Sequence, residues 1–268
     1  MEKLRAWLFA PGHNEKLLSK VFTVGADAVV LDLEDAVPND LKDRARELVR
    51  EVAASQRCWV RVNRPVTQTC ERDLAELAGV AIGLRLPKVE SAADVAWVAE
   101  RAPNVALDCS IESARGVLAA FEIANSPACT LLSYGGVDLA LDLGISGGEL
   151  ETLTSRSLIV LAARAAGKPP PSDGVHTLID DDIGLRREAE GARSLGFFGK
   201  SAIHPRQVPI IKEVFTPTTE EVEWANRVLS AFDASGGAAT KLPNGEFVDT
   251  AVAERARQLL GRFSDGTH

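Results

Sequence analysis

The sequence predicts an α/β fold of the TIM (β/α)8 barrel class with a C-terminal helical extension. Apolar runs of strand length alternate with amphipathic stretches of helix length, which is typical of a parallel sheet with crossover helices. Eight such units favour closure into a barrel, and the 268 residues match the roughly 250 that such barrels commonly take. Polar residues follow many of the apolar runs, at the strand ends where a barrel builds its active site.

Each predicted strand is a short apolar run, which indicates burial on both faces of a parallel sheet. The seventh is short and rich in proline, a residue that cannot donate a ladder hydrogen bond. The predicted strands are Leu4–Ala10, Ala26–Leu33, Cys58–Val62, Gly83–Leu86, Val105–Ile111, Cys129–Tyr134, Pro171–Val175 and Phe197–Ile203.

Amphipathic segments between these runs predict the crossover helices. Asn39 can cap a helix whose apolar residues between Leu41 and Val52 fall on one stripe. The other predicted helices lie near Ser91–Ala99, Ala114–Ala124, Thr154–Ala166 and Asp182–Ser194.

The chain continues beyond the eighth predicted strand. Thr218-Thr-Glu-Glu221 is a capping box that starts a helix, and Ser235-Gly-Gly then predicts a hinge. The tail ends in a second amphipathic helix, with Val252 and Phe263 near the two ends of its apolar stripe. We therefore predict residues 1–233 as the barrel with its flanking helices. Residues 234–268 form a C-terminal lid segment, which could cover its own active site or a neighbour's.

Composition and charge narrow the class of protein. The net charge of −8 argues against a nucleic-acid partner, and no apolar run approaches the roughly 18 residues that cross a bilayer. The N-terminal segment lacks the apolar core of a signal peptide, which predicts a cytoplasmic location. Four cysteines without a CxxC pair and four histidines without metal-binding spacing argue against a zinc or redox site.

Two carboxylates, Glu112 and Asp138, each follow an apolar run closely. If these runs are neighbouring strands, their backbones lie about 5 Å apart and both side chains can reach one cation. Two carboxylates completed by waters and a chelating substrate are typical of Mg²⁺. The alternative for either residue is a cap of the following helix, and spacing alone does not separate the two interpretations.

Arg61 has an apolar neighbour on each side within a predicted core strand, so its charge must meet an anion. It could pair structurally with Asp32, Glu34 or Asp35, or bind a substrate carboxylate with its planar fork. Glu34 and Asp35 could in turn orient Arg61, hold metal-bound waters or act as a base. Helix capping is a further interpretation of Asp35.

Three other residues have more than one interpretation. Lys88 could form a Schiff base, contact a phosphate or be a surface charge. His204, at the end of the last strand, is more often a structural hydrogen-bonding group than a catalyst. Asp249 opens the tail helix, and an N-cap alone would account for it.

Taken together, these segments resemble the citrate lyase β-subunit-like family of the HpcH/HpaI aldolase superfamily over almost the whole chain. Alanine replaces the family's usual serine at Ala6, and Ser113 replaces the usual threonine, which removes no group that the chemistry needs. The matching motifs are Arg5-Ala-Trp-Leu-Phe-Ala-Pro-Gly12, Leu31-Asp-Leu-Glu-Asp-Ala-Val37, Val60-Arg-Val-Asn63, Leu86-Pro-Lys88, Ile111-Glu-Ser-Ala-Arg-Gly116, Gly135-Gly-Val-Asp-Leu139, Leu195-Gly-Phe-Phe-Gly-Lys-Ser-Ala-Ile-His-Pro-Arg-Gln207 and Phe247-Val-Asp249.

The resemblance implies a TIM barrel that assembles as a trimer or hexamer. It implies a Mg²⁺-dependent carbon–carbon lyase acting on a short β-hydroxyacyl-CoA, such as malyl-, β-methylmalyl- or citramalyl-CoA, with acyl-CoA and α-keto acids as small-molecule partners. The alternatives are the citryl-ACP lyase β subunit of a citrate lyase complex, and a non-catalytic CoA or keto-acid binding protein.

The resemblance also implies roles for individual residues. Glu112 and Asp138 would be the Mg²⁺ ligands, and Arg61 would anchor the keto-acid carboxylate. Asp249 would be the acid–base that the tail brings to a neighbouring subunit's site, supported by Glu34 and Asp35. The remaining expected contacts are substrate contacts from Lys88, Gly135, Gly136 and Val137, and CoA phosphate contacts from basic residues such as Lys88, Lys168, Lys200 and Arg206.

Overall fold

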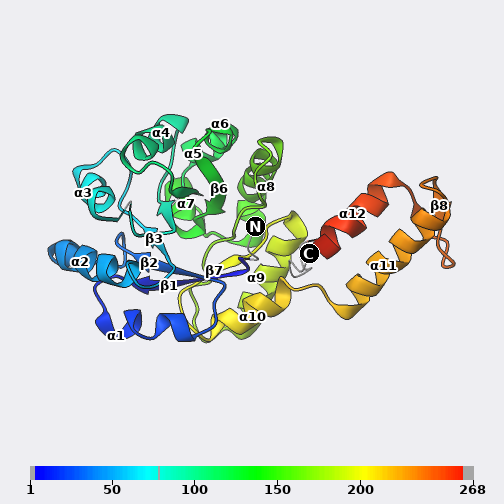
Figure 1. The fold of residues 1–268 in the computed structure, drawn as a ribbon, viewed down its shortest axis with the longest axis horizontal. Coiled ribbons are helices and arrows are strands. Elements are labelled where there is room, and N and C mark those ends of the chain that lie inside the picture. The colour runs from blue at the N-terminus through cyan, green and yellow to red at the C-terminus, as the bar shows by residue number, and fades with distance from the viewer. Residues whose placement is uncertain (1–3, 78, 262–268) are drawn as a thin grey trace. The chain divides into compact units, whose positions relative to one another are not determined.

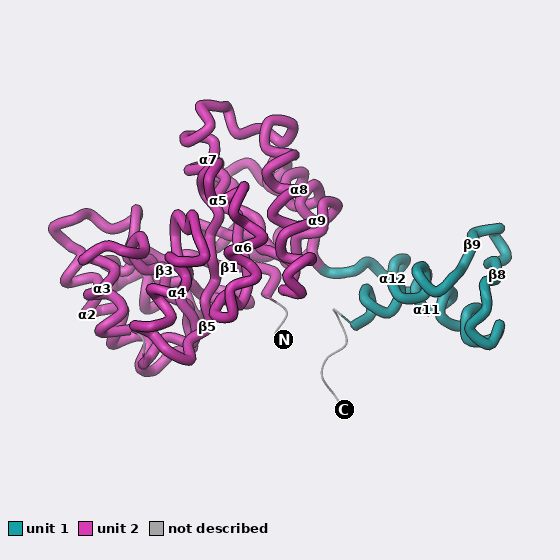
Figure 2. The backbone as a smooth tube through the Cα atoms, turned by 90° about the horizontal axis from the view of Figure 1, so that it is seen from above, with its two compact units in different colours: residues 1–3, 216–268 teal, residues 4–215 magenta. Residues whose placement is uncertain are grey.

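The computed structural model describes residues 4–77 and 79–261, which divide into two compact units. The larger unit, Leu4–Phe215, carries the sheet and the helices around it (Figure 1). The smaller unit begins at Thr216, as the two colours of Figure 2 show. This division precedes helix α11 (Thr219–Ala234), whereas the predicted boundary at residue 234 follows it. The reason is that the apolar face of α11 packs within the smaller unit.

The larger unit is built on a curled sheet of seven parallel strands in the order β6-β5-β4-β3-β2-β1-β7. These strands match seven of the eight predicted runs, and they are β1 (Ala6–Pro11), β2 (Ala28–Asp32), β3 (Trp59–Arg61), β4 (Gly83–Leu86), β5 (Ala106–Ile111), β6 (Cys129–Tyr134) and β7 (Lys200–Ala202).

The predicted run Pro171–Val175 forms two isolated parallel bridges instead of a full strand. Ser172 pairs with Ser133 of β6, and Asp173 pairs with Lys200 of β7, so the segment contacts both outer strands of the sheet. Pro171 has no backbone N–H to donate, and its carbonyl accepts a hydrogen bond from Phe198 N at 2.9 Å. The proline-rich composition therefore shortens the pairing without removing it.

The two faces of the sheet bury different residues. The outer face joins helix residues such as Val49 and Ile123 in one apolar core with strand residues such as Leu8 and Leu84. On the inner face, the rings of Trp7 and Trp59 meet at 5.2 Å.

Buried polar side chains also cross the inner face. Arg85 of β4 pairs with Asp108 and donates to Ser201 of β7 at 3.1 Å and to Ser172 at 3.3 Å. Strands β4 and β7 are not neighbours in the sheet, so these contacts span the concave side and follow from its curl.

The helices of the larger unit surround its strands (Figure 1). They are α1 (Glu15–Leu18), the 3-10 helices η1 (Val21–Thr23) and η2 (Asn39–Leu41), α2 (Lys42–Ala53), α3 (Gln68–Leu77), α4 (Ala92–Arg101), α5 (Ala114–Leu118), α6 (Ala120–Asn125), α7 (Gly136–Leu143), α8 (Glu149–Ala165), α9 (Asp182–Leu195) and α10 (Gln207–Val214).

The predicted helices are confirmed with two differences. The predicted helix Ala114–Ala124 is divided at Ala119 into α5 and α6. Asn39 is not the expected cap, because it begins η2 and α2 starts after Leu41 without a side-chain cap. A 3-10 turn supplies the entry to the helix in its place.

The smaller unit is a helical hairpin with a short β-ribbon, β8 (Thr240–Lys241) and β9 (Phe247–Val248), between α11 and α12 (Thr250–Gly261). The Thr218 capping box is confirmed, with Glu221 N donating to Thr218 Oγ1 at 3.2 Å. The predicted break after α11 is also present, since Gly236 and Gly237 both have positive φ. Phe263 of the predicted terminal stripe lies outside the described residues.

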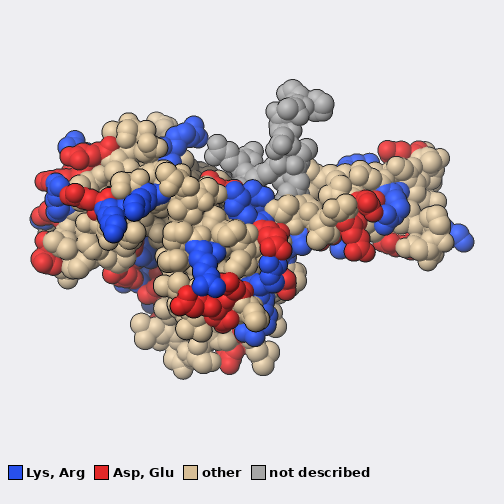
Figure 3. All heavy atoms as spheres, turned by 90° about the horizontal axis from the view of Figure 1, so that it is seen from below, with Lys and Arg blue, Asp and Glu red and all other residues tan. Residues whose placement is uncertain are grey.

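Within residues 4–77 and 79–261, no helix combines the length and the apolar character that crossing a membrane requires. Acidic and basic side chains are interspersed on the surface drawn in Figure 3. Neither sign of charge dominates the part of that face that the described residues form.

Candidate functional site

The candidate site is formed where the carboxyl ends of β2 to β6 meet. Parallel pairing aligns Asp32 with Arg61 and Arg61 with Arg85, so the ends of these strands lie along one edge. Glu34, Lys88, Glu112 and Asp138 each follow one of these ends. This common edge explains why residues far apart in the sequence come together.

Arg61 is held by Asp32 in a side-on pair, with Nε–Oδ1 and Nη2–Oδ2 distances of 2.7 Å. Its Nη1 atom lies 3.0 Å from Glu34 Oε2, so the structural ion pair considered from the sequence is confirmed. Burial opposes the charge of Arg61, but the hydrogen bonds and charge of Asp32 raise its pKa above the ordinary value. The side-on pair uses two of the five N–H groups, which leaves donors for another carboxylate.

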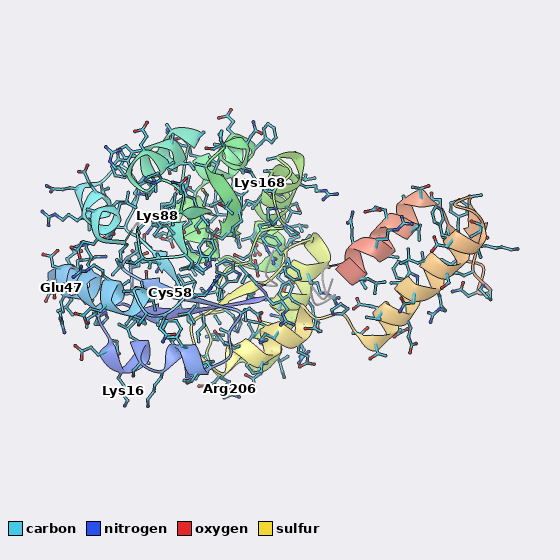
Figure 4. All side chains as sticks on the ribbon, viewed as in Figure 1. Lys16, Glu47, Cys58, Lys88, Lys168 and Arg206 are labelled. Carbon is cyan, nitrogen blue, oxygen red and sulfur yellow. The ribbon has the colours of Figure 1, made fainter. Side chains whose placement is uncertain are left out.

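Lys88 lies among three carboxylates in the larger unit, where Figure 4 labels it. Its Nζ atom is 2.6 Å from Glu34 Oε1, 2.9 Å from Asp35 Oδ2 and 3.5 Å from Asp138 Oδ1. Burial lowers the pKa of Lys88, but the hydrogen bonds that its ammonium donates to Glu34 and Asp35 outweigh burial and raise it. The ammonium therefore stays protonated, which argues against the Schiff-base interpretation.

Glu112 is buried, and its Oε2 atom has no hydrogen-bond partner among the described residues. Burial, reinforced by the charges of Glu34 and Asp138, raises the pKa of Glu112 to about 8. The backbone of Gly135 lies against this carboxylate, because a Cβ there would fall 2.8 Å from Glu112 Cδ. Ser113, and not Glu112, caps α5.

Asp138 is in the first turn of α7 and is partly exposed, within reach of Lys88. The capping interpretation is wrong for Asp138, since Gly135 holds the N-cap position of α7. It is also wrong for Asp35, whose carboxylate pairs with Lys88 instead.

The donor set fits Mg²⁺. Both candidate ligands are carboxylates, Glu112 is buried with an unpartnered oxygen, and the surrounding charge is negative. In the described part of the chain, no cluster of three or more histidine, cysteine or acidic side chains forms a complete protein cage. Mg²⁺ commonly keeps several waters and takes few protein ligands, in agreement with such a pair.

Gly136 and Val137 also line a cavity of about 560 Å³ bordered by β6, α7, α8 and α9. Its wall includes a buried ionic network in which Asp173 pairs with Arg156 at 3.3 Å and with Lys200 at 2.7 Å. Lys200 is therefore committed to an ion pair inside the protein. This corrects its expected role as a CoA phosphate contact.

Other predicted contacts lie elsewhere. Lys168 donates to the carbonyl of Cys129, the first residue of β6, and is therefore at the amino end of the sheet. Arg206 is exposed and pairs with Asp180 and Asp182. His204 accepts from Arg206 N at 3.3 Å, which agrees with a structural role.

Asp249 belongs to the smaller unit. Its Oδ1 atom accepts from Val252 N at 2.9 Å, so the N-cap interpretation is confirmed for α12. A cap does not exclude a second role, and the acid–base assignment stays a prediction.

Lys42 is a site residue that the sequence did not reveal. Its Nζ atom donates to the carbonyls of Leu33 and Glu34 at 2.6 Å and to Asn63 Oδ1 at 2.8 Å. Asn63 is in turn fixed by the buried Asp73. The available signal is a lysine in the first turn of a helix, where a positive charge is unfavourable unless another contact holds it.

The chain is similar to a family model, to known proteins and to solved structures. The family model described as HpcH/HpaI aldolase/citrate lyase matches residues 5–205. The chain is 39% identical to a (3S)-malyl-CoA thioesterase of Cereibacter sphaeroides over 96% of this chain and 94% of that protein. It is 37% identical to a citrate lyase subunit beta-like protein of Mycobacterium tuberculosis, over 97% of this chain and 96% of the relative. It also resembles the crystal structure of CitE from Mycobacterium tuberculosis in complex with magnesium, acetoacetate and coenzyme A. The TM-score is 0.84 and the identity 36%, covering 96% of this chain and 97% of CitE.

Proposed function

Because the chain belongs to the HpcH/HpaI aldolase/citrate lyase family, we propose that it is a Mg²⁺-dependent carbon–carbon lyase. Its substrates would be short β-hydroxyacyl-CoA thioesters such as malyl-, β-methylmalyl- or citramalyl-CoA, cleaved to or formed from an acyl-CoA and an α-keto acid. The observation that carries the proposal is the buried Glu112 carboxylate, which has an unpartnered oxygen and faces other negative charges. The similarity to CitE with its magnesium, acetoacetate and coenzyme A supports these ligand classes.

Glu112 and Asp138 are the proposed Mg²⁺ ligands. When bound, the ion supplies Lewis-acid polarisation of the substrate oxygens and a template for their orientation. Glu34 and Asp35 support the site by fixing Lys88 and Arg61.

Arg61 is the proposed anchor of the α-keto acid carboxylate. Asp32 fixes the guanidinium, so the remaining N–H groups are already oriented before substrate binds. Gly136 and Val137 would contribute backbone N–H contacts, since the first N–H groups of α7 have no acceptor within the helix. Gly135 would contribute a backbone contact without its N–H, which donates to Ile111 O at 3.0 Å.

Asp249 is the proposed acid–base, brought by the lid segment 234–268 to the site of a neighbouring subunit. In the synthetic direction its carboxylate would take a proton from the methyl group of acetyl-CoA. Asp249→Asn separates this role from capping, because asparagine caps a helix as well as aspartate does. Turnover should fall about 100-fold or more with the melting temperature unchanged. Equal turnover in Asp249→Asn and the wild type would contradict the assignment.

The finer architecture is part of the same proposal. The bridges of Ser172 and Asp173 to β6 and β7 support an eighth strand position and a closed (β/α)8 barrel with the helical unit as its extension. Four buried free cysteines are consistent with a cytoplasmic location.

A homo-oligomer, trimer or hexamer, is supported by a stripe of exposed leucines on α8. Leu150 is 82% exposed and Leu161 is 63% exposed, opposite the buried face of the helix. Leu150→Lys with Leu161→Lys should lower the mass measured by analytical ultracentrifugation.

Hydrolysis of the thioester is a second candidate activity, favoured by the similarity to the (3S)-malyl-CoA thioesterase. The citryl-ACP lyase β subunit and a non-catalytic CoA or keto-acid binding protein are the remaining alternatives. Each candidate activity predicts a different set of products, and the non-catalytic binding protein predicts none.

The test is product analysis with malyl-, β-methylmalyl-, citramalyl- and citryl-CoA, in Mg²⁺ and in EDTA. Magnesium-dependent release of a keto acid with an acyl-CoA supports the lyase, and free CoA with a hydroxy acid supports the thioesterase. Glu112→Gln should lower kcat/KM by more than about tenfold, because it removes a charged metal ligand. Thermal stabilisation by acetyl-CoA without turnover of any substrate would overturn the enzyme assignment.

A further inference from the structure

We infer that Lys88 brings the net charge of this site to −2, equal and opposite to that of one divalent cation, and so limits how tightly the metal is held. The inference rests on the proposed function, because it concerns the Mg²⁺ carried by Glu112 and Asp138. It assigns Lys88 a role different from the phosphate contact expected from the sequence.

The first support is the balance of charges at the site. Five carboxylates face three cations there, and when all are ionised two negative charges stay uncompensated, which is the number that one Mg²⁺ neutralises. The carboxylates are Asp32, Glu34, Asp35, Glu112 and Asp138, and the cations are Lys42, Arg61 and Lys88.

The second support is the position of the Lys88 ammonium. It contacts Glu34, Asp35 and Asp138, so one cation connects the end of β2 to the first turn of α7. Lys42 donates instead to backbone carbonyls and to Asn63, and Arg61 is paired with Asp32 and Glu34. Among the described residues, Lys88 is therefore the cation that contacts a proposed metal ligand.

The third support is the backbone of Lys88, which has a φ of 52°. A non-glycine residue adopts this left-handed conformation at an energetic cost and keeps it where the surrounding structure imposes it. At Lys88 this backbone conformation accompanies the contacts of the side chain with three carboxylates. A lysine in ordinary extended backbone after Pro87 would not be held in this orientation.

Two opposite effects follow from this position. The ammonium repels a metal dication and competes with it for Asp138, so it weakens metal binding. It also offsets the repulsion between the carboxylates and an anionic substrate. A neutral residue at position 88 should therefore hold the metal more tightly and the substrate less tightly.

The test measures metal affinity directly, by calorimetry for Mg²⁺ and by competition with Tb³⁺ luminescence. Lys88→Met should bind Mg²⁺ about tenfold more tightly and Tb³⁺ about thirtyfold more tightly, because the Coulomb energy scales with the charge of the ion. KM for the keto acid should rise in the same variant. Lys88→Asn provides a second neutral variant that tolerates the left-handed backbone.

Two controls isolate the charge. Lys88→Arg keeps it and should leave Mg²⁺ affinity within about threefold of the wild type. Lys168→Met removes a lysine from the amino end of β6 and should not change Mg²⁺ affinity. Unchanged or weaker Mg²⁺ binding in both neutral variants, beside normal binding by the wild type, would overturn this inference alone. A wild-type protein that binds neither ion would overturn the metal site itself.

Discussion

Gly135→Ala tests whether close packing against Glu112 is what places the metal carboxylate. The φ of Gly135 is −106°, which alanine adopts without strain, so the added methyl group is the whole perturbation. That methyl would meet Glu112 Cγ first, and would lie 2.8 Å from Cδ and 2.9 Å from Oε1. Carbon atoms pack at about 3.5–4.0 Å, so the Glu112 side chain must retreat by about 1 Å or more.

We expect this displacement to weaken Mg²⁺ binding by about 10–100-fold, the usual range when the residues that orient a ligand are changed. A shift of about 1 Å at a reacting group also costs up to about 100-fold in kcat/KM. Calorimetric titration with Mg²⁺ and steady-state kinetics measure the two effects separately. The global fold should persist, since alanine also restricts the unfolded chain.

The double variant Gly135→Ala with Glu112→Asp tests the steric cause. Removing one methylene from the glutamate makes room for the new methyl group, so Gly135→Ala should cost less than about threefold in Mg²⁺ affinity in the Glu112→Asp background. Gly191→Ala in α9 is the matched control, because its methyl would approach nothing closer than Glu149 at 4.0 Å. Wild-type Mg²⁺ affinity in Gly135→Ala would refute the reasoning.

Three further outcomes concern stability. Gly191→Ala should raise the free energy of unfolding in urea by about 0.5–1 kcal/mol, since glycine is unfavourable inside a helix. Burial alone raises the pKa of Asp27, but hydrogen bonds from Arg5 and Ala6 N outweigh it and lower that pKa below 3.8. The stabilisation from Asp27 is therefore present above this value and is lost as the pH falls through the lowered pKa. Wild type should exceed Asp27→Asn by about 1–3 kcal/mol at pH 7 and lose that advantage in acid denaturation series. Asp73→Ala should cost about 3–5 kcal/mol in chemical denaturation, because it leaves the buried Arg46 without its inner partner; a cost below about 1 kcal/mol would show that Asp43 alone holds Arg46.

The sequence was informative where burial dictated the pattern. Strand β2 is apolar up to its last residue, Asp32, because both of its faces are covered. Glu112 and Asp138 could be predicted from the sequence for the same reason, since a carboxylate that follows a buried strand lies at the carboxyl edge of the sheet. The pair between Arg61 and the acids of β2 was foreseen because a charge inside a core strand requires a partner.

Other features depend on contacts that composition does not encode. Lys168 follows a helix, so it precedes the next strand position and lies at the amino end of the sheet, opposite the site. The inward turn of Lys88 depends on a backbone conformation that lysine rarely adopts. Lys42 donates to backbone carbonyls, and its place in the first turn of a helix does not indicate which groups it contacts. The division before α11 reflects the packing of its apolar face against α12. The sequence pattern predicts that α11 has an apolar face, but not which surface covers that face.

The bridges of Ser172 and Asp173 have a consequence for the behaviour of the protein in concentrated solution. Unpaired outer strands offer free N–H and C=O groups to other chains and promote aggregation. Here Tyr134 N donates to Ser172 O and Ser201 N donates to Asp173 O, both at 2.9 Å, so a few residues cover β6 and β7 along the bridged positions. A segment too short to count as a strand therefore protects the sheet from pairing with another molecule.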